Sequence, residues 1–308
     1  MKSYDIAIIG AGPGGLYAHY YANLKGFKSC IIEANDACGG QPLMLFPQKE
    51  IHDFPCFEKV TGHEIIDILS SQISNKENIF LKTAATHIEK ENDSLIIQTK
   101  NGETFSSKFI IIATGGGFFN YNKINGVENP TTHYSVKDIN VYKDKKVVIA
   151  GGGDSAIDWA LELLKKGITK DVSIVHRRNE FRANGQKIEE LKSFNPTFYL
   201  NKSAVVLDGN RLGLTDNQTS KVDVLRYDYL IVQYGLSFSL QDNTLLKNFK
   251  LSTANSIIVD YWGRTNIDNI YAIGNAAFHD NKPKLISIAV TDAIKAIDDI
   301  AKKVHKYE

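Results

Sequence analysis

The chain has 308 residues and a formal net charge of +1 at pH 7, and 43% of its residues are hydrophobic. A chain of this length needs more than one small core, which predicts two domains. The near-zero charge and the lack of an apolar run of about 18 residues argue against a nucleic-acid partner and a membrane-spanning helix, so we expect neither partner.

The first predicted element is an uncharged apolar strand over 6–9, which suits a parallel strand covered on both faces. Gly10, Gly12 and Gly15 follow as G-x-G-x-x-G. The first glycine permits a tight turn, the second admits a pyrophosphate, and the third allows close packing of helix and strand. Glu33 ends the next strand, where a carboxylate accepts hydrogen bonds from an adenosine ribose. This stretch predicts a dinucleotide-binding βαβ unit, in which the helix N-terminus faces the phosphates.

Two features after this unit have alternative interpretations. Gly39-Gly40-Gln41 is either a plain turn or a second place where backbone lies against a cofactor. The irregular stretch 45–55 contains aromatic residues and two prolines. It either places a ring against a flat heterocycle or covers the core.

A helix is predicted over 61–74, with Thr61 as its N-cap and Glu64 completing a capping box. The segments 84–90, 94–99 and 104–108 then predict an antiparallel meander. A separate buried strand is expected over 109–113. The glycine cluster that follows marks either a cofactor contact or a crossing between domains.

The stretch from Lys146 repeats the first unit. A strand over 147–150 leads into Gly151-x-Gly153-x-x-Ala156, and Asp154 and Ser155 open the helix that follows. Two copies of one supersecondary unit favour duplicated nucleotide-binding domains more strongly than either turn alone.

The second repeat differs from the first at the end of its second strand. The strand over 172–175 ends in His176-Arg177-Arg178, with Arg182 close behind, where the first repeat has an acid. Guanidinium groups pair with a ribose 2′-phosphate, whereas an acid selects the free hydroxyl. This pattern predicts a preference for NADPH over NADH, and the alternative is a solvated basic turn.

A helix over 184–194 and short strands up to 232 complete the second domain, and strands near 256–259 and 271–273 return to the first. We therefore expect an α/β fold of two Rossmann-like domains, one inserted in the other. The outer domain comprises 1–114 and 237–308, and the inserted domain comprises 115–236. A terminal helix is predicted over 287–303.

This order of motifs resembles the flavoproteins of the thioredoxin reductase type over essentially the whole chain. The stretch L-F-P-Q-K-E-I-H-D-F-P and the stretch G-G-G-D-S-A-I-D-W-A resemble most the ferredoxin–NADP reductases of that fold. The resemblance implies a homodimer with FAD in the outer domain and NADPH in the inserted one. Such an enzyme exchanges electrons between NADPH and ferredoxin or flavodoxin, by hydride transfer to flavin N5, and requires no catalytic side chain and no metal.

The resemblance also implies roles for residues of the FAD domain. Glu33 holds the ribose, Gln41 contacts the cofactor near its ribityl chain with Gly40 beside it as a cofactor-binding residue, and Phe46 stacks on the isoalloxazine where many relatives have Tyr.

Three further residues of this site follow from the resemblance. Ala85 meets the adenine through its backbone, and Phe119 lies near the flavin at the domain crossing. Asn275 stands where the family pattern has Asp, so the amide retains hydrogen bonding but loses the charge. That change leaves a non-catalytic nucleotide-binding redox module as an alternative function.

The positions of the three cysteines indicate how electrons leave the flavin. Cys30, Cys38 and Cys56 form no C-x-x-C, so we expect electrons to leave from the flavin edge. The alternative is a flavin disulfide reductase that uses an unrecognised cysteine. An odd cysteine count fits a reducing compartment and predicts a cytoplasmic protein.

Lysines near the C-terminus have two interpretations. They form either a basic rim for an acidic partner or a solvated helix face. The residues concerned are Lys282, Lys284, Lys302, Lys303 and Lys306.

Overall fold

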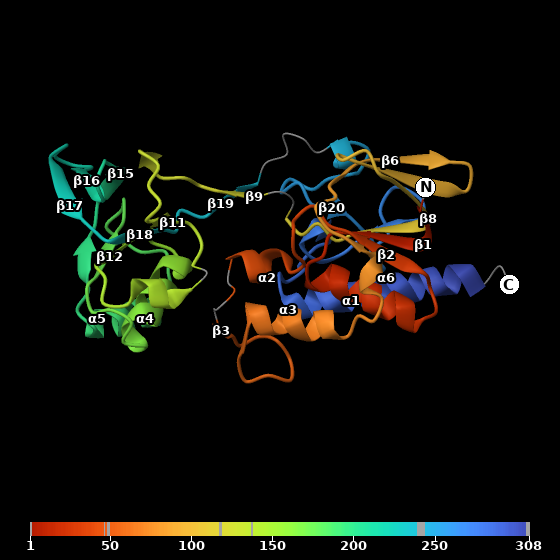
Figure 1. Ribbon diagram of the computed structural model, residues 1–308, viewed down its shortest axis with the longest axis horizontal. Coiled ribbons are helices and arrows are strands. Elements are labelled where there is room, and N and C mark those ends of the chain that lie inside the picture. Colours follow the sequence, from red (N-terminus) through yellow and green to blue (C-terminus); the bar gives the residue numbers. More distant parts are fainter. Residues whose placement is uncertain are drawn as a thin grey trace. The chain divides into compact units, whose positions relative to one another are not determined.

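The computed structural model describes residues 2–45, 47, 50–116, 119–136, 138–238 and 244–305. The chain forms two compact units, one made of Met1–Phe118 with Phe238–Glu308 and the other of Phe119–Ser237 (Figure 1). The second unit is an insertion in the first, and β9 (Phe119–Tyr121) pairs with β19 (Leu236–Phe238) where the chain enters and leaves it.

A seven-stranded sheet forms the centre of the first unit, with the order β5-β2-β1-β8-β7-β6 and with β21 beside β8. β1 (Lys2–Ile9) lies between β2 (Ser29–Ile32) and β8 (Thr104–Ile112) and runs parallel to both. The remaining strands of this sheet are β5 (Ile79–Phe80), β6 (Ala85–Glu91), β7 (Ser94–Thr99) and β21 (Ile270–Ala272).

β8 corrects the expectation of two separate strands in this region. Its first half pairs antiparallel with β7, as Ser107 with Leu95, and its last part pairs parallel with β21, as Ile110 with Ile270. The change from an alternating to a continuous apolar pattern therefore marks a change of neighbour along one strand.

Helices cover one face of this sheet. α1 (Pro13–Leu24), α3 (Gly62–Ser71) and α6 (Ile286–His305) pack on alternate residues of β1, Ile6 and Ile8. α1 and α6 lie side by side (Figure 1). Ala7 and Ile9 face the opposite side, which the 245–257 segment covers. Because both faces are buried, β1 is apolar on both sides.

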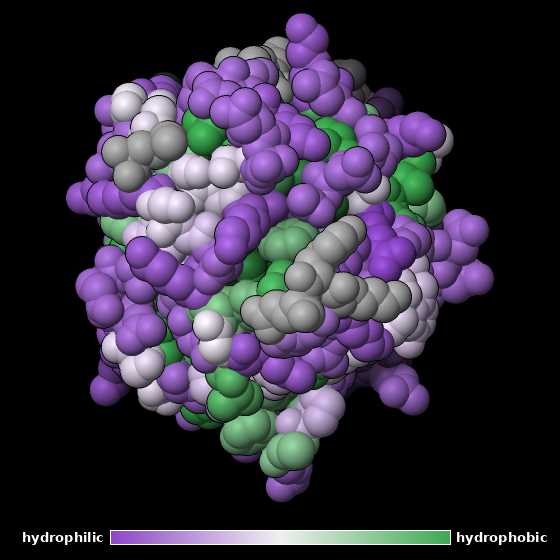
Figure 2. Space-filling model, turned by 90° about the vertical axis from the view of Figure 1, so that its right-hand side faces the viewer, coloured by the Kyte–Doolittle hydropathy of each residue, from purple (hydrophilic) through white to green (hydrophobic). Residues whose placement is uncertain are grey.

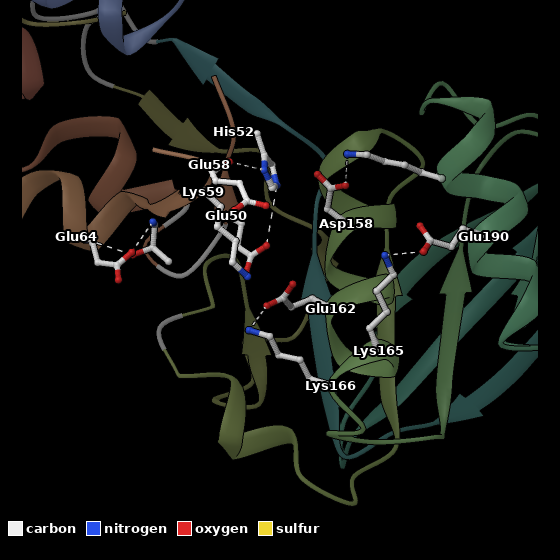
Figure 3. Close-up of polar contacts among 12 residues, drawn as sticks. Glu50, His52, Glu58, Lys59, Glu64, Asp158, Glu162, Lys165, Lys166 and Glu190 are labelled. Atoms are coloured by element: carbon white, nitrogen blue, oxygen red, sulfur yellow. Dashed lines mark hydrogen bonds and ion pairs between the residues drawn. The ribbon is translucent and has the colours of Figure 1, made fainter. Parts of the chain in front are cut away.

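The predicted capping box at the start of α3 is confirmed. The Thr61 hydroxyl accepts the Glu64 N–H at 3.2 Å, and the Glu64 carboxylate, shown in Figure 3, accepts the Thr61 N–H at 2.7 Å. The other short elements of this unit are α2 (Gly40–Leu45), β3 (Glu50–Ile51), β4 (Val60–Thr61), η1 (Lys76–Asn78), η3 (Thr244–Leu246), β20 (Ile257–Ile258), η4 (Gly274–Ala276) and β22 (Ala277–Phe278).

The second unit contains a parallel sheet with the order β11-β18-β12-β13-β14. Two helices, α4 (Asp154–Lys165) and α5 (Gly185–Ser193), cover one face, and a four-stranded sheet covers the other. The parallel strands are β11 (Thr132–His133), β12 (Val147–Ala150), β13 (Val172–Val175), β14 (Thr197–Tyr199) and β18 (Tyr229–Val232). The other elements are β10 (Asn125–Gly126), η2 (Ile139–Tyr142), β15 (Lys202–Val206), β16 (Arg211–Asp216) and β17 (Val222–Arg226).

Ion pairs join the two helices of this unit. Lys165 on α4 reaches Glu190 on α5 at 2.6 Å, and Lys187 on α5 reaches Asp158 on α4 at 2.5 Å (Figure 3). Such part-exposed pairs add little to the stability of the unit.

The surface of the first unit is mainly polar on the face that lies at the right of Figure 1. Hydrophilic side chains cover most of that face, and the apolar side chains form small separate patches (Figure 2). Among the described residues, no helix has both the length and the apolar character needed to cross a membrane.

We expect His19 to make the stability of the fold depend on pH. This α1 residue is fully buried, with its Nδ1 2.8 Å from the Ser29 hydroxyl, and burial lowers its pKa from the ordinary 6.5. The unfolded chain then binds a proton that the folded chain does not, so stability falls as the pH drops below 6.5, by at most about 1.4 kcal/mol per pH unit.

Thermal unfolding at about pH 7.5 and about pH 5.5 measures this effect. His19→Gln should reduce the loss of stability on acidification relative to the wild type. Equal acid sensitivity in wild type and His19→Gln would contradict the assignment.

Candidate functional site

The two glycine turns have the same backbone hydrogen bonds. The Gly10 N–H donates to the Ile32 carbonyl at 2.9 Å, and the Gly151 N–H donates to the Val175 carbonyl at 3.0 Å. Each bond ties the end of the first strand to the end of the second. The repeat predicted from the sequence is therefore also a repeat of geometry.

Both first glycines are required by the backbone. Gly10 and Gly151 have positive φ angles of 109° and 156°. A Cβ at Gly10 would lie 2.5 Å from the Ala113 carbonyl oxygen, and one at Gly151 would lie 2.6 Å from the Gln233 carbonyl oxygen. The residue that follows β8 in the first sheet, and the residue that follows β18 in the second, thus lie directly against the turn.

The helices that follow these turns start without a side-chain cap. Gly12 is the N-cap of α1 and Gly153 is the N-cap of α4, and neither position carries a capping hydrogen bond. The N-termini of α3 and α5, in contrast, are capped by Thr61 and Asn184. The two glycine-turn helices therefore keep their N–H groups and positive dipole ends available for an anion.

Space is left over the second glycine of each turn. A Cβ at Gly12 would come no closer to the protein than 3.9 Å, and a Cβ at Gly153 would meet nothing within 4 Å. At Gly15, however, a Cβ would lie 1.9 Å from the Gly10 carbonyl oxygen. The third glycine thus serves helix packing, whereas the second leaves room that a dinucleotide pyrophosphate fits.

Glu33 braces the first turn. This residue is 6% exposed, and its carboxylate accepts the Ala11 N–H at 2.6 Å and the Asn35 N–H at 2.8 Å. The Asn35 side-chain amide donates a third bond at 2.7 Å. A carboxylate has about four acceptor positions, so one remains for a ribose hydroxyl.

α2 lies against the first turn. The Gly39 N–H donates to the Ala11 carbonyl at 2.8 Å, and a Cβ at Gly40 would lie 2.9 Å from the Gly12 Cα. Gly40 also has a φ of 57°. The Gly39-Gly40-Gln41 stretch is therefore the entry to a helix rather than a plain turn, and it presents backbone next to the space over Gly12.

Gln41 and Asn275 meet at this edge. The Asn275 side-chain amide donates to the Gln41 side-chain oxygen at 3.1 Å, and the Gln41 nitrogen lies 3.9 Å from the Cβ position of Gly115. Segments far apart in the sequence, α2, η4 and the end of β8, thus bring polar amides together. Ribityl hydroxyls and phosphate oxygens suit these donors and acceptors.

The other predicted residues of the first unit are partly described. Ala85 starts β6, and backbone bonds from Lys82 to Asn35 and from Thr83 to Glu33, both 2.8 Å, hold this segment beside the acid. Phe119 lies in β9, with its side chain outside the described structure, and Phe46 lies outside the described residues.

At the second turn, Asp154 opens α4 but faces the following loop. Its carboxylate accepts the Asn184 N–H at 3.0 Å, and the Arg182 N–H donates to the Gly152 carbonyl at 2.8 Å. Ser155 is half-buried in the first turn of α4. The acid therefore anchors the basic loop to the glycine turn.

His176 is buried and packs its ring against Gly152 of this turn. Its ring stacks on Phe181 with centroids 5.5 Å apart, and a Cβ at Gly152 would lie 2.3 Å from it. Burial lowers its pKa, and neighbouring arginines lower it further. Its neutral ring supports the turn, while Arg177, Arg178 and Arg182 are exposed and supply the positive charge.

Sequence reasoning missed several residues that shape these sites. Asn35 is separated from Glu33 by one residue, a spacing at which Asn commonly bonds a nearby group, so a signal existed. Gly152 matters through its contact with His176. The roles of Lys282 and Asp292, described below, depend on tertiary contacts that have no local signal.

The group of lysines near the C-terminus is not one surface, and the prediction was wrong for Lys282. The Lys282 side chain is 7% exposed and bound to Asp292. Lys302 and Lys303 lie over the rings of Trp262 and Tyr271, at 4.7 Å and 5.1 Å from the centroids. Lys306 lies outside the described residues.

The cysteines are all unpaired. Cys30 is fully buried in β2, where burial raises the pKa of its thiol to about 12, and burial also raises the pKa of the half-buried Cys38. Cys56 is exposed. Within the described part of the chain, no group of three His, Cys, Asp or Glu side chains is arranged to hold a metal.

Comparison with known sequences assigns this chain to a family. The model of the pyridine nucleotide-disulphide oxidoreductase family matches residues 4–293. Relatives named ferredoxin–NADP reductase from Malacoplasma penetrans and Acholeplasma laidlawii are 36% and 35% identical, over 98% and 99% of this chain and 97% of each relative. A relative from Bacillus licheniformis, named ferredoxin–NADP reductase 2, is 33% identical over 97% of this chain and 92% of its own.

Solved structures of two disulfide-reducing enzymes share the architecture. The thioredoxin reductase of Lactococcus lactis, in its FR conformation, is 25% identical with a TM-score of 0.76, and the match covers 98% of this chain and 99% of that one. The bacillithiol disulfide reductase of Staphylococcus aureus is 21% identical with a TM-score of 0.74, over 98% and 99% of the two chains. The α/β fold with two Rossmann-like domains is confirmed.

We expect Gly12 and Gly15 to respond differently to alanine. Gly12→Ala adds a Cβ where the protein leaves space, so folding should be preserved while FAD binding weakens roughly tenfold or more. Gly15→Ala places a Cβ against the Gly10 carbonyl and should cost about 2 kcal/mol or more of stability.

Fluorescence titration of the FAD-free proteins with FAD, together with their melting temperatures, separates the two effects. Unchanged FAD affinity in Gly12→Ala, or an unchanged melting temperature in Gly15→Ala, would refute the assignment of these glycines.

Proposed function

The chain belongs to the pyridine nucleotide-disulphide oxidoreductase family and, within it, to the group that contains the ferredoxin–NADP reductases, and from this premise we propose that it passes electrons between NADPH and ferredoxin or flavodoxin through FAD. The observation that carries the proposal is the presence of two uncapped dinucleotide turns in one chain, of which the second alone is followed by arginines.

The first turn is the proposed FAD site. The N-terminus of α1 and the space over Gly12 receive the pyrophosphate, and the remaining acceptor position of Glu33 receives the adenosine ribose. Gln41 and Asn275 orient the ribityl chain through their paired amides. Phe46, Ala85 and Phe119 complete this site in the proposal, which for them rests on the family resemblance.

The second turn is the proposed NADPH site. The N-terminus of α4, with Gly153 and Ser155, receives the pyrophosphate. Arg177 and Arg178 are exposed directly after β13, where a guanidinium pairs with the 2′-phosphate, and Arg182 adds a third charge. His176 and Asp154 hold the loop that carries these arginines.

The bound flavin supplies chemistry that no side chain here provides, since it accepts a hydride and releases electrons one at a time. The protein's contribution is binding and orientation. Its thiols do not form a C-x-x-C, and Cys30 stays protonated in the core, so an iron–sulfur or flavin protein suits electron exit better than a disulfide substrate. In the proposal, the working form is a homodimer in the cytoplasm.

Anaerobic visible spectra test this function. The FAD-loaded protein should lose its flavin absorbance on addition of NADPH and regain it when oxidised ferredoxin or flavodoxin is added. Cys38→Ser/Cys56→Ser should behave in the same way, because neither thiol belongs to the electron path.

Two outcomes would point to the rival functions. A protein that takes up FAD but is not reduced by NADPH would favour a non-catalytic redox module. Loss of turnover in the double cysteine variant, with the rate of flavin reduction unchanged, would favour a disulfide reductase.

The arginines should determine the choice between the two nicotinamide cofactors. Arg177→Ala/Arg178→Ala should raise the KM for NADPH roughly tenfold or more, because charge-assisted bonds to the 2′-phosphate are lost, and should leave the KM for NADH nearly unchanged. Arg226→Ala, on β17 of the same unit, is the matched control. Steady-state kinetics with both cofactors provide the measurement, and an equal rise in both KM values would count against the assignment.

A further inference from the structure

A buried ion pair lies directly beneath the turn that carries Asn275. Lys282 Nζ is 2.5 Å from Asp292 Oδ2, and the two side chains are 7% and 8% exposed. Asp292 belongs to α6, and Lys282 follows β22 in the connection that leads to α6. The pair therefore joins this connection to the helix that covers the sheet.

The ammonium group of Lys282 has a partner for each of its donors. Besides Asp292, it donates to the Gly274 carbonyl at 2.6 Å and to the Ala277 carbonyl at 3.3 Å. An ammonium has three N–H donors, so all of them are used. Two of these bonds hold Gly274, which begins η4, and Ala277, which directly follows it.

The carboxylate of Asp292 also binds the backbone of the turn that carries Asn275. Its Oδ2 also accepts the Gly274 N–H at 3.1 Å. Gly274 has a φ of 60°, and a Cβ there would lie 3.2 Å from the Cβ of Ala289 on α6. Both backbone polar groups of Gly274 are therefore fixed by the ion pair, and a glycine conformation allows α6 to approach.

Asn275 lies between the two points that the pair holds. Its side-chain amide reaches Gln41 at 3.1 Å, and its carbonyl receives only a long bond of 3.4 Å from the Ser256 hydroxyl. The Asn275 side chain is therefore directed at α2 chiefly because Gly274 and Ala277 on either side are held in place. Because the ion pair is buried and every N–H of Lys282 has an acceptor, the pair holds these backbone groups in a fixed position, which a solvent-exposed pair would not do.

We propose that Lys282 and Asp292 are positioning residues of the FAD site, which hold η4 so that Asn275 meets Gln41. This proposal rests on the proposed function of that site. Neither residue needs to touch the cofactor. Their loss should weaken FAD binding and alter the flavin environment, because the Asn275 amide is no longer fixed.

α6 provides a matched control for this pair. Asp299 lies further along the helix, is 3% exposed, and binds the Arg264 guanidinium and, at 2.7 Å, the Tyr271 hydroxyl. It is likewise a buried acid that ties α6 to other segments, but it holds Arg264 before β21 and Tyr271 within β21 and makes no bond to η4 among the described contacts. Asp299→Asn should therefore reduce stability without moving Asn275.

The test compares Asp292→Asn with Asp299→Asn. FAD-free proteins are titrated with FAD, and the melting temperature, visible spectrum and midpoint potential of the FAD-loaded proteins are measured. Both variants should melt at lower temperature. Only Asp292→Asn should bind FAD roughly ten- to a hundredfold more weakly, the effect of losing a hydrogen bond to a charged group, and shift the flavin spectrum and potential.

Lys282→Met/Asp292→Leu guards against simple misfolding, because it removes both buried charges of the pair together. Lys295, whose Nζ lies 3.8 Å from Asp292 Oδ1, also loses this partner, but its side chain is 19% exposed and can be solvated. It should fold and still bind FAD weakly, while Asp292→Glu, which keeps the carboxylate, should recover most of the affinity. If the wild type binds FAD and Asp292→Asn or the double variant binds it equally well, or if Asp299→Asn shows the same loss, the inference fails alone. A wild type that does not bind FAD would overturn the proposed function as well.

Discussion

A single backbone hydrogen bond, made twice, underlies both sites. In each unit the first glycine after the central strand donates to the last carbonyl of the neighbouring strand, Ile32 in one case and Val175 in the other. The carbonyl of Ala113, after β8, and that of Gln233, after β18, then approach the same glycines so closely that a Cβ would clash with them. The chain can turn so tightly only with a glycine, and the helix therefore starts at the edge of the sheet with its N–H groups uncapped. The anion-binding ends of α1 and α4 follow from this geometry.

The two copies of this unit became different at the residue after the second strand. Glu33 and His176 occupy equivalent places, and both are buried and bonded to their own chain. Each acts first as a support for its glycine turn. The difference in charge that a ribose meets comes partly from the remaining acceptor position of Glu33 and, in the second unit, from the exposed arginines that follow His176. Structural support and cofactor choice are thus divided among neighbouring residues.

Local patterns predicted the parts of the fold that depend on local physics. The glycine turns and the capping box at Thr61 could both be recognised from spacing and residue type. The continuity of β8 could not, because one strand changes its partners along its length. Lys282 looked like a surface cation, because nothing in the residues around it indicates that an acid on α6 and the carbonyls of Gly274 in η4 and Ala277 in β22 enclose it. Such contacts join segments that only the tertiary fold brings together.

The pairing of β8 with β21 also determines when this protein becomes complete during its synthesis. Residues 110–112 leave the ribosome early, but their partners 270–272 follow only after the whole inserted unit has been translated. The parallel sheet of the inserted unit uses residues within 132–232, so this unit has all its strands before the outer unit has its last one. Until then the nascent outer unit has the last part of one edge of β8 unpaired, since β7 covers only its first half. The turn around Asn275 also depends on α6, which is synthesised still later, so this part of the first site is completed at the end of the chain.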